Sequence, residues 1–257
     1  MRIVAVLIWV FLISVYSVVA SDTDIELLEA ILNGSPDDVH QMIDQGANVN
    51  SRHEHGRTPL MIASEYALYP EVLQVLIDEG AEINARSENG STPLHYAARR
   101  AMFRDHDPEF LRVLLDAGAN VNARKAFDET VLILAALNYG YEGLGLLLEA
   151  GAEVNAETDY GATALHGASQ LNDDLSATQF LIERGAKINH TDGSGRTPLM
   201  LAAKYNTNPK VLEALLEFGA EASMSDNAGM TAWDYLQENE ALQDTDVYWR
   251  LNDLRFE

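Results

Sequence analysis

Apolar and polar positions alternate along the chain in a regular order of two short apolar segments and one polar stretch. In one such unit, Leu94, Ala97 and Ala98 lie on one face of an expected helix that begins at Thr92-Pro93. The segment "FLRVLLDAG" then has apolar residues at helical spacing and ends at Gly118. A polar, extended finger follows. Because one helix pair this short cannot bury its own apolar face, the pattern predicts units stacked into a solenoid.

The same two phrases recur at related spacings along the chain. The first phrase is of the type "TPLHYAA", and the second, of the type "GANVNA", begins 12 residues before the threonine of the next first phrase. From each threonine to the following glycine the spacing varies from 21 to 26 residues, so insertions fall in one half of the unit. The threonines are Thr58, Thr92, Thr130, Thr163, Thr197 and Thr231, and the glycines are Gly46, Gly80, Gly118, Gly151, Gly185 and Gly219.

These phrases resemble the ankyrin repeat, and the resemblance extends over nearly all of residues 21–257. It implies an all-α solenoid of about seven helix-turn-helix units with β-hairpin-like fingers. The first and last segments resemble capping units, and the last has Asp234 at the usual histidine position. The expected units are 21–52, 53–86, 87–124, 125–157, 158–191, 192–225 and 226–257.

The N-terminal 20 residues have a different pattern from the rest. Arg2 precedes an apolar run, and Val18 and Ala20 occupy the small-residue positions before a polar, acidic stretch. This pattern is typical of a secretory signal peptide cleaved after Ala20. The apolar run is also close in length to the ~20 residues that a membrane-spanning helix needs, so an uncleaved anchor is the alternative. We expect an exported protein, periplasmic or secreted and of bacterial type, that meets a membrane only if this segment is retained.

Composition excludes several classes of function. The formal net charge of -23 argues against binding to nucleic acid, which requires a basic face. With no cysteine, the chain has no disulfides and no thiolate chemistry. It contains no GxSxG, Walker A, GxGxxG or HExxH pattern. We therefore expect a protein that is not an enzyme, uses no cofactor and is a monomer.

The histidines fall into two groups. His95 and His166 are in the fourth position of the first phrase, where the resemblance implies hydrogen bonds that tie adjacent loops. Met61 and Met200 fill the same position elsewhere, so a catalytic role is not expected there. His53 and His55 are two residues apart in a finger and could begin a metal site if that segment is extended. No third ligand is implied by the sequence, so a solvated loop is the preferred interpretation.

The resemblance places partner binding on the concave side, at the finger tips and the ends of the first helices. Residues 52–125 carry a net charge of -2 between strongly acidic flanks. We hypothesise a partner-binding stripe there, suited to an acidic segment of a protein; ordinary soluble surface is the alternative. Its members are Arg52, Arg57, Tyr66, Arg86, Arg99, Arg100, Arg124, Lys125, Phe127 and Tyr160.

The longest spacing comes from an insertion at residues 101–107, in the turn between the two helices of one unit. We expect a tolerated loop there, with a second contact for a partner as the alternative. The function that this sequence predicts is non-catalytic protein–protein interaction, as a scaffold, adaptor or inhibitor. The alternative is a ligand- or metal-binding accessory to an envelope enzyme, for example in oxidative stress defence, an idea that comes only from the resemblance to exported bacterial proteins.

Overall fold

The computed structural model describes residues 22–100 and 108–254. In these residues it has 14 α-helices, which confirms the predicted all-α class. The expected signal segment and the insertion at 101–107 lie outside the described residues. In chain order the helices are α2 (Asp22–Asn33), α3 (Pro36–Asp44), α4 (Pro59–Tyr66), α5 (Glu71–Asp78), α6 (Pro93–Arg100), α7 (Glu109–Asp116), α8 (Val131–Ala136), α9 (Tyr141–Glu149), α10 (Ala164–Leu171), α11 (Leu175–Glu183), α12 (Pro198–Tyr205), α13 (Pro209–Glu217), α14 (Ala232–Leu236) and α15 (Asp246–Leu254).

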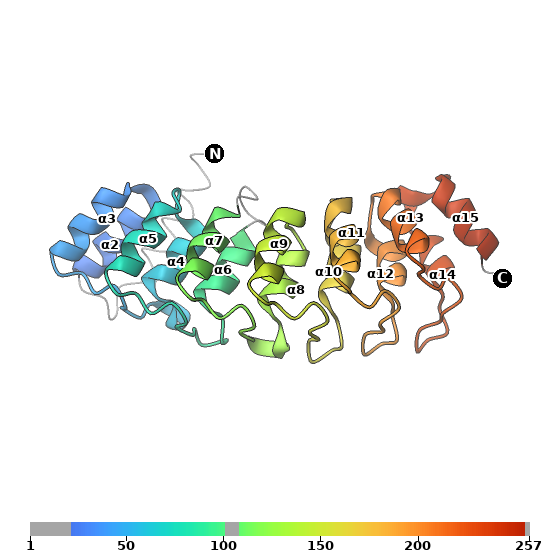
Figure 1. The fold of residues 1–257 in the computed structure, drawn as a ribbon, viewed down its shortest axis with the longest axis horizontal. Coiled ribbons are helices and arrows are strands. Elements are labelled where there is room, and N and C mark those ends of the chain that lie inside the picture. Colours follow the sequence, from blue (N-terminus) through green and yellow to red (C-terminus); the bar gives the residue numbers. More distant parts are fainter. Residues whose placement is uncertain (1–21, 101–107, 255–257) are drawn as a thin grey trace. The chain divides into compact units, whose positions relative to one another are not determined.

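The chain divides into two compact units. Of the described residues, the first contains 22–97 and 113–119, and the second contains 98–100, 108–112 and 120–254. Within the second unit, α8, α10, α12 and α14 contact one another in chain order, and α9, α11, α13 and α15 form a second row. Figure 1 shows that the loops after α9, α11 and α13 all project from the same end of these helices. Helix pairs with projecting fingers are the arrangement that the sequence predicts.

The first helix of a pair begins at a threonine because its hydroxyl caps the helix. Thr58 and Thr197 accept hydrogen bonds from the backbone N–H groups of Met61 and Met200, and a proline follows each threonine. A cap of this kind satisfies a donor that the first turn leaves unpaired, and proline has no N–H there to lose. The predicted Thr-Pro helix start is therefore confirmed at these positions.

The fingers are turns rather than strands. A backbone hydrogen bond spans the turn of a finger, as from Ser87 N–H to the Ser91 carbonyl (3.0 Å), and isolated bridges pair Arg124 with Thr130 and Ser225 with Thr231. A side chain often supports the turn as well. Asp192 Oδ1 accepts from the backbone N–H groups of Ser194 and Arg196, both at 2.9 Å. Each finger is therefore compact and depends on its neighbours for further support.

Alanine and leucine form the core between helices. Ala135, Ala202 and Ala203 are fully buried, as are the leucines of the outer row such as Leu147 and Leu215. Small alanines allow the first helices of neighbouring pairs to approach closely, while leucines fill the space between the two rows. Within the described ranges, no helix is both long and apolar enough to cross a membrane.

At five of the six glycine phrases, an asparagine at the base of the finger bridges neighbouring pairs. Asn155 Nδ2 donates to the carbonyl of Gly185 (2.9 Å), and its Oδ1 accepts from the backbone N–H of Lys187 (2.9 Å). Four other asparagines, at the same position of the "GANVN" phrase, donate in the same way to the carbonyl of the glycine that begins the next phrase. They are Asn50, Asn84, Asn122 and Asn189. One amide thus satisfies the carbonyl of the glycine that ends the following helix.

A second set of asparagines bridges the opposite ends of the first helices in the second unit. Asn206 Nδ2 donates to the carbonyls of Ser169 (2.9 Å) and Asn172 (3.2 Å), and its Oδ1 accepts from the Asn208 backbone N–H. Asn172 and Asn239 repeat the arrangement one pair before and one pair after. Each of these buried amides satisfies two carbonyls at the end of the preceding helix. These bridges were not predicted from the repeated phrases.

The variant Asn206→Ala is expected to lower the free energy of unfolding by about 2–3 kcal/mol, because it leaves two buried carbonyls without this donor. Asn155→Ala is the matched control at an exposed bridge, for which a loss of about 1 kcal/mol is expected. Urea unfolding followed by circular dichroism measures both. Equal losses in the free energy of unfolding for the two variants would show that a buried bridge stabilises the fold no more than an exposed one.

Candidate functional site

Two arginines of the predicted stripe connect neighbouring fingers. In the first unit, Arg52 Nη1 donates to the carbonyls of Gly56 (2.9 Å) and Arg86 (2.7 Å). In the second unit, Arg124 Nη1 donates to the carbonyl of Glu157 (3.0 Å) and to Asp128 Oδ2 (3.1 Å). Both arginines stand six residues before their threonine and bond to the same position of the next finger. Their guanidinium groups therefore hold fingers together.

Arg57 is part of a buried ion pair in the first unit. Its Nη2 lies 2.6 Å from Oε2 of Glu65, whose side chain is 0% exposed. The guanidinium also stacks over the rings of Tyr96 (4.6 Å) and Tyr66 (5.5 Å). Burial and then the nearby Glu65 carboxylate raise the pKa of Tyr66. Arg57 and Tyr66 thus belong to an internal cluster rather than to an open surface.

Arg100 requires a correction. It was predicted to lie on the partner-binding stripe, but its side chain is only 2% exposed, and its guanidinium lies 3.7 Å from the centre of the Phe110 ring. The end of α6 turns this side chain inward, where it stacks on the aromatic residue of α7. Arg99, one residue earlier, is half-buried. Lys125 is also largely covered and forms an ion pair with Glu129.

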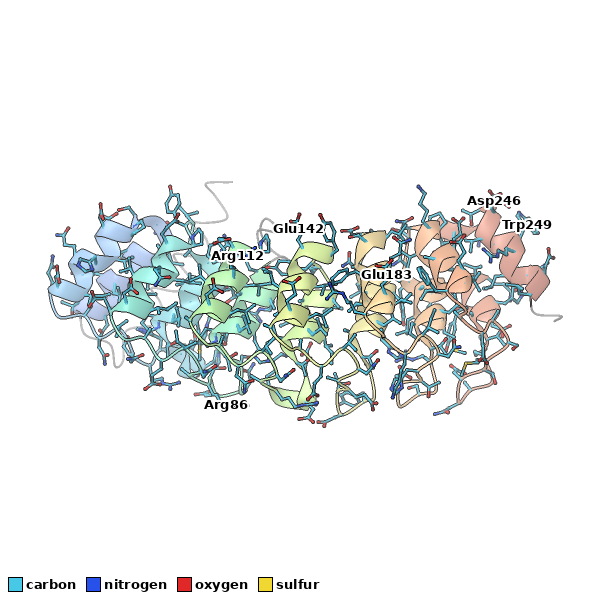
Figure 2. The ribbon with its side chains drawn as sticks, viewed as in Figure 1. Arg86, Arg112, Glu142, Glu183, Asp246 and Trp249 are labelled. Carbon is cyan, nitrogen blue, oxygen red and sulfur yellow. The ribbon has the colours of Figure 1, made fainter. Side chains whose placement is uncertain are left out.

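The side chain of Arg86 is exposed, as is that of Arg52. Figure 2 shows Arg86 in the finger region of the first unit. Its exposed guanidinium keeps the prediction of a contact with a carboxylate at this position.

Phe127 and Tyr160 form an exposed aromatic pair in the second unit. They occupy the same position, three residues before the threonine, in two successive fingers. Phe127 is 61% exposed and Tyr160 is 65% exposed, and their ring centroids lie 5.9 Å apart. Exposed aromatic residues that cluster are uncommon on soluble surfaces unless they serve binding. This aromatic pair is therefore the member of the predicted stripe whose geometry best suits contact with a partner.

The backbone under Phe127 is strained. Phe127 has φ 63° and the next residue, Asp128, has φ 55°, so both are in the left-handed region. In the other fingers the residue equivalent to Asp128 is a glycine, which adopts this region at little cost. A bulky residue there costs roughly 1–2 kcal/mol, and such strain concentrates at functional sites. The tip holds the Phe127 ring outward at a cost to stability.

The resemblance implies that the buried histidines form hydrogen bonds between adjacent loops, and His166 does so. His166 Nδ1 accepts from the Thr163 backbone N–H (3.2 Å), so its Nε2 carries the proton and donates to the carbonyl of Arg196 in the next finger (3.1 Å). Burial lowers the pKa of His166, which keeps this ring neutral. In the first unit, His95 Nδ1 makes the same contact with Thr92. These rings fasten helix starts to fingers.

His53 and His55 do not share a face of an extended segment, which corrects the geometric basis of the metal hypothesis. His55 has φ 58° inside a 3-10 turn (Glu54–Gly56), so the two-residue alternation of a strand does not hold. His53 Nε2 lies 2.9 Å from Ser51 Oγ, and burial lowers its pKa. Across residues 22–100 and 108–254, no three His, Asp or Glu side chains are grouped as a metal site requires.

The second unit contains a cleft of about 460 Å³ that was not predicted from the sequence. It lies between the turn that joins α8 to α9 and the turn that joins α10 to α11. The lining includes Leu137, Asn138 and Glu142 from the first turn and Asp173 and Asp174 from the second. Figure 2 shows Glu142 at the end of α9 that faces away from the fingers. A glycine at the start of α9, where α11 and α13 have a capping side chain, was the available signal in the sequence.

Paired helices, threonine caps and inter-finger asparagines define a helical repeat protein. The family model described as "Ankyrin repeats (3 copies)" matches residues 27–125, 99–192 and 165–243. The chain belongs to the ankyrin repeat family.

The fold is also similar to a solved structure. The ankyrin repeat domain of human ASB11 superposes with a TM-score of 0.75 and 24% sequence identity, over 89% of this chain and 96% of that chain. At this identity the likeness concerns the fold alone. No curated protein matches the sequence.

The contacts of Arg57 predict that its loss damages folding rather than recognition. Arg57→Ala removes the ion-pair partner of a fully buried carboxylate, and a loss of about 3 kcal/mol in the free energy of unfolding is expected. Arg250→Ala, which changes an exposed arginine of α15, is expected to cost less than about 0.5 kcal/mol. Thermal and urea unfolding compare the two. A stability unaffected by Arg57→Ala would return Arg57 to the candidate surface.

Proposed function

We propose that this protein is a non-catalytic binding module that recognises a protein partner through the finger tips of its second unit. Ankyrin repeats are general protein–protein interaction modules, so the class of function follows from the family. The aromatic pair of Phe127 and Tyr160 carries the finer proposal, because both rings are exposed and adjacent. A scaffold, adaptor or inhibitor needs no reactive group, only such a surface.

The pair suits an apolar segment of the partner. Two large rings offer apolar contact area at a small cost in side-chain entropy, and burial of such anchors dominates binding free energy. The strain at Phe127 supports the same interpretation, since selection for stability alone would favour glycine or asparagine there. In the first unit, the exposed Arg86 suits a carboxylate, as proposed for an acidic partner segment.

The double variant Phe127→Asn with Tyr160→Ser tests the proposal with residues that the chain itself uses. Asn89 and Ser194 occupy the same finger position in other fingers, so the fold is expected to tolerate both. Asparagine also accepts the left-handed backbone. Partner affinity is expected to fall at least about 30-fold, since an anchor of this kind contributes about 2 kcal/mol or more.

The control is Trp249→Ala, which removes an exposed aromatic residue of α15, at the other end of the second unit's sequence. Each variant is used to recover partners from cells of the source organism, and the recovered proteins are quantified by mass spectrometry. The partner recovered in the largest amount is then titrated with each variant by calorimetry. Equal recovery by the wild type and the double variant, with loss only in Trp249→Ala, would move the surface away from the fingers.

We further propose export to the periplasm or the cell exterior, with removal of residues 1–20. The support is the sequence of that segment, with a positive start, an apolar run and small residues before Ser21. Fractionation of cells followed by N-terminal sequencing is expected to find a soluble extracytoplasmic protein that begins at Ser21. A protein that is retained in the membrane fraction with its intact N-terminus would instead show an anchor.

A further inference from the structure

The cleft between the α8–α9 and α10–α11 turns carries an inference that goes beyond binding at the fingers. It belongs to the second unit, at the ends of the helices away from the finger tips (Figure 2). A volume of about 460 Å³ is within the range of specific binding pockets and can hold a few side chains.

The cleft exists because α9 begins differently from its neighbours. Asp174 caps α11 and Asn208 caps α13 through their side chains, but the N-cap of α9 is Gly140, which has no side chain to fill the space. A Cβ atom at Gly140 would lie 2.4 Å from Asp174 Oδ2. The second glycine of this segment, Gly143, allows the Tyr139 ring to lie against α9, since a Cβ there would be 2.3 Å from Tyr139 Cδ1. Two glycines therefore shape this cleft.

The cleft is lined by carboxylates and carries no basic residue among the described residues that line it. Glu142, Asp173 and Asp174 all have exposed side chains. Because Asp174 also caps α11, its carboxylate is held in place at the cleft. Three carboxylates without a lysine or arginine make a local negative potential that attracts a cation.

Apolar side chains adjoin these carboxylates. Leu171 is 58% exposed and Tyr141 is 54% exposed, and both line the cleft together with Leu137. Asn138 adds a polar group, because its Nδ2 atom is buried and has no hydrogen-bond partner in the described part of the chain. A buried amide donor without a partner is costly, so this side chain is a further irregularity beside the cleft.

We propose that this cleft docks a basic-apolar segment of a protein partner. The arginine or lysine of that segment lies among Glu142, Asp173 and Asp174, and a neighbouring apolar side chain covers Leu171 and Tyr141. Charge complementarity selects this occupant, since a second copy of this chain has a net charge of -23.

The test uses a fluorescent, terminally capped peptide Gly-Leu-Arg-Leu-Gly and the whole protein. NMR is expected to show saturable shifts in the backbone amides of residues 137–143 and 171–174. Replacing the peptide arginine by glutamate is expected to weaken binding at least tenfold. In the protein, Glu142→Gln with Asp173→Asn is expected to weaken it about tenfold, as two exposed ion pairs are lost.

The matched control is Glu149→Gln with Glu217→Gln, which removes the same charge at exposed positions outside the cleft and is expected to leave the affinity unchanged. Leu171→Asn tests the apolar half and is expected to weaken binding about fivefold. The finger variant Phe127→Asn with Tyr160→Ser is expected to bind this peptide normally, which separates the cleft from the proposed function.

Three results would overturn the proposal. The first is equal affinity for the arginine and glutamate peptides, or no binding at millimolar peptide. The second is an equal loss of peptide affinity in the control variant Glu149→Gln with Glu217→Gln, which would indicate that the peptide is attracted to the whole acidic chain. The third is agmatine binding as tightly as the peptide, which would make the cleft a site for small cations instead of a docking surface.

Discussion

The structure depends on amide side chains that connect one helix pair to the next. A single pair exposes an apolar face and a set of unpaired helix-end carbonyls, so it has no stable state alone. Asn50, Asn122 and Asn155 satisfy both a donor and an acceptor of the following pair. Because each bridge needs both partners at fixed separation, the half of the unit that contains it has constant length. Differences in length fall in the other half, between the threonine and the following glycine.

This constraint also decides which charged residues remain for recognition. Arg52 and Arg124 bond to carbonyls of the next finger, and Arg57 is paired with a buried carboxylate. Positive charge on the stripe is thus largely used to hold fingers and helices in place. What varies freely is the finger tip, where the side chain points away from the bridges. Phe127 and Tyr160 occupy those positions, which is why the surface is better described as aromatic than as basic.

The sequence predicted the parts of the fold that repeat. Thr58 and Thr197 cap helices as expected, and His166 bonds to the adjacent finger. Periodicity made these predictions secure, because the same local physics applies in each unit. The direction of a single long side chain was not predictable in this way. Arg100 is buried on Phe110 rather than exposed beside Arg99, since its direction depends on the packing of α7.

The cleft illustrates why departures from a repeat are the informative positions. In the second unit, Asn172, Asn206 and Asn239 occupy equivalent buried positions, but one pair earlier the residue is Tyr139. Helix α8 also ends after six residues, and α9 begins at an uncapped glycine. Each change lowers the regularity that stabilises a solenoid, and all of them lie around one cleft. Changes that cost stability and occur together are best explained by a ligand that contacts them together.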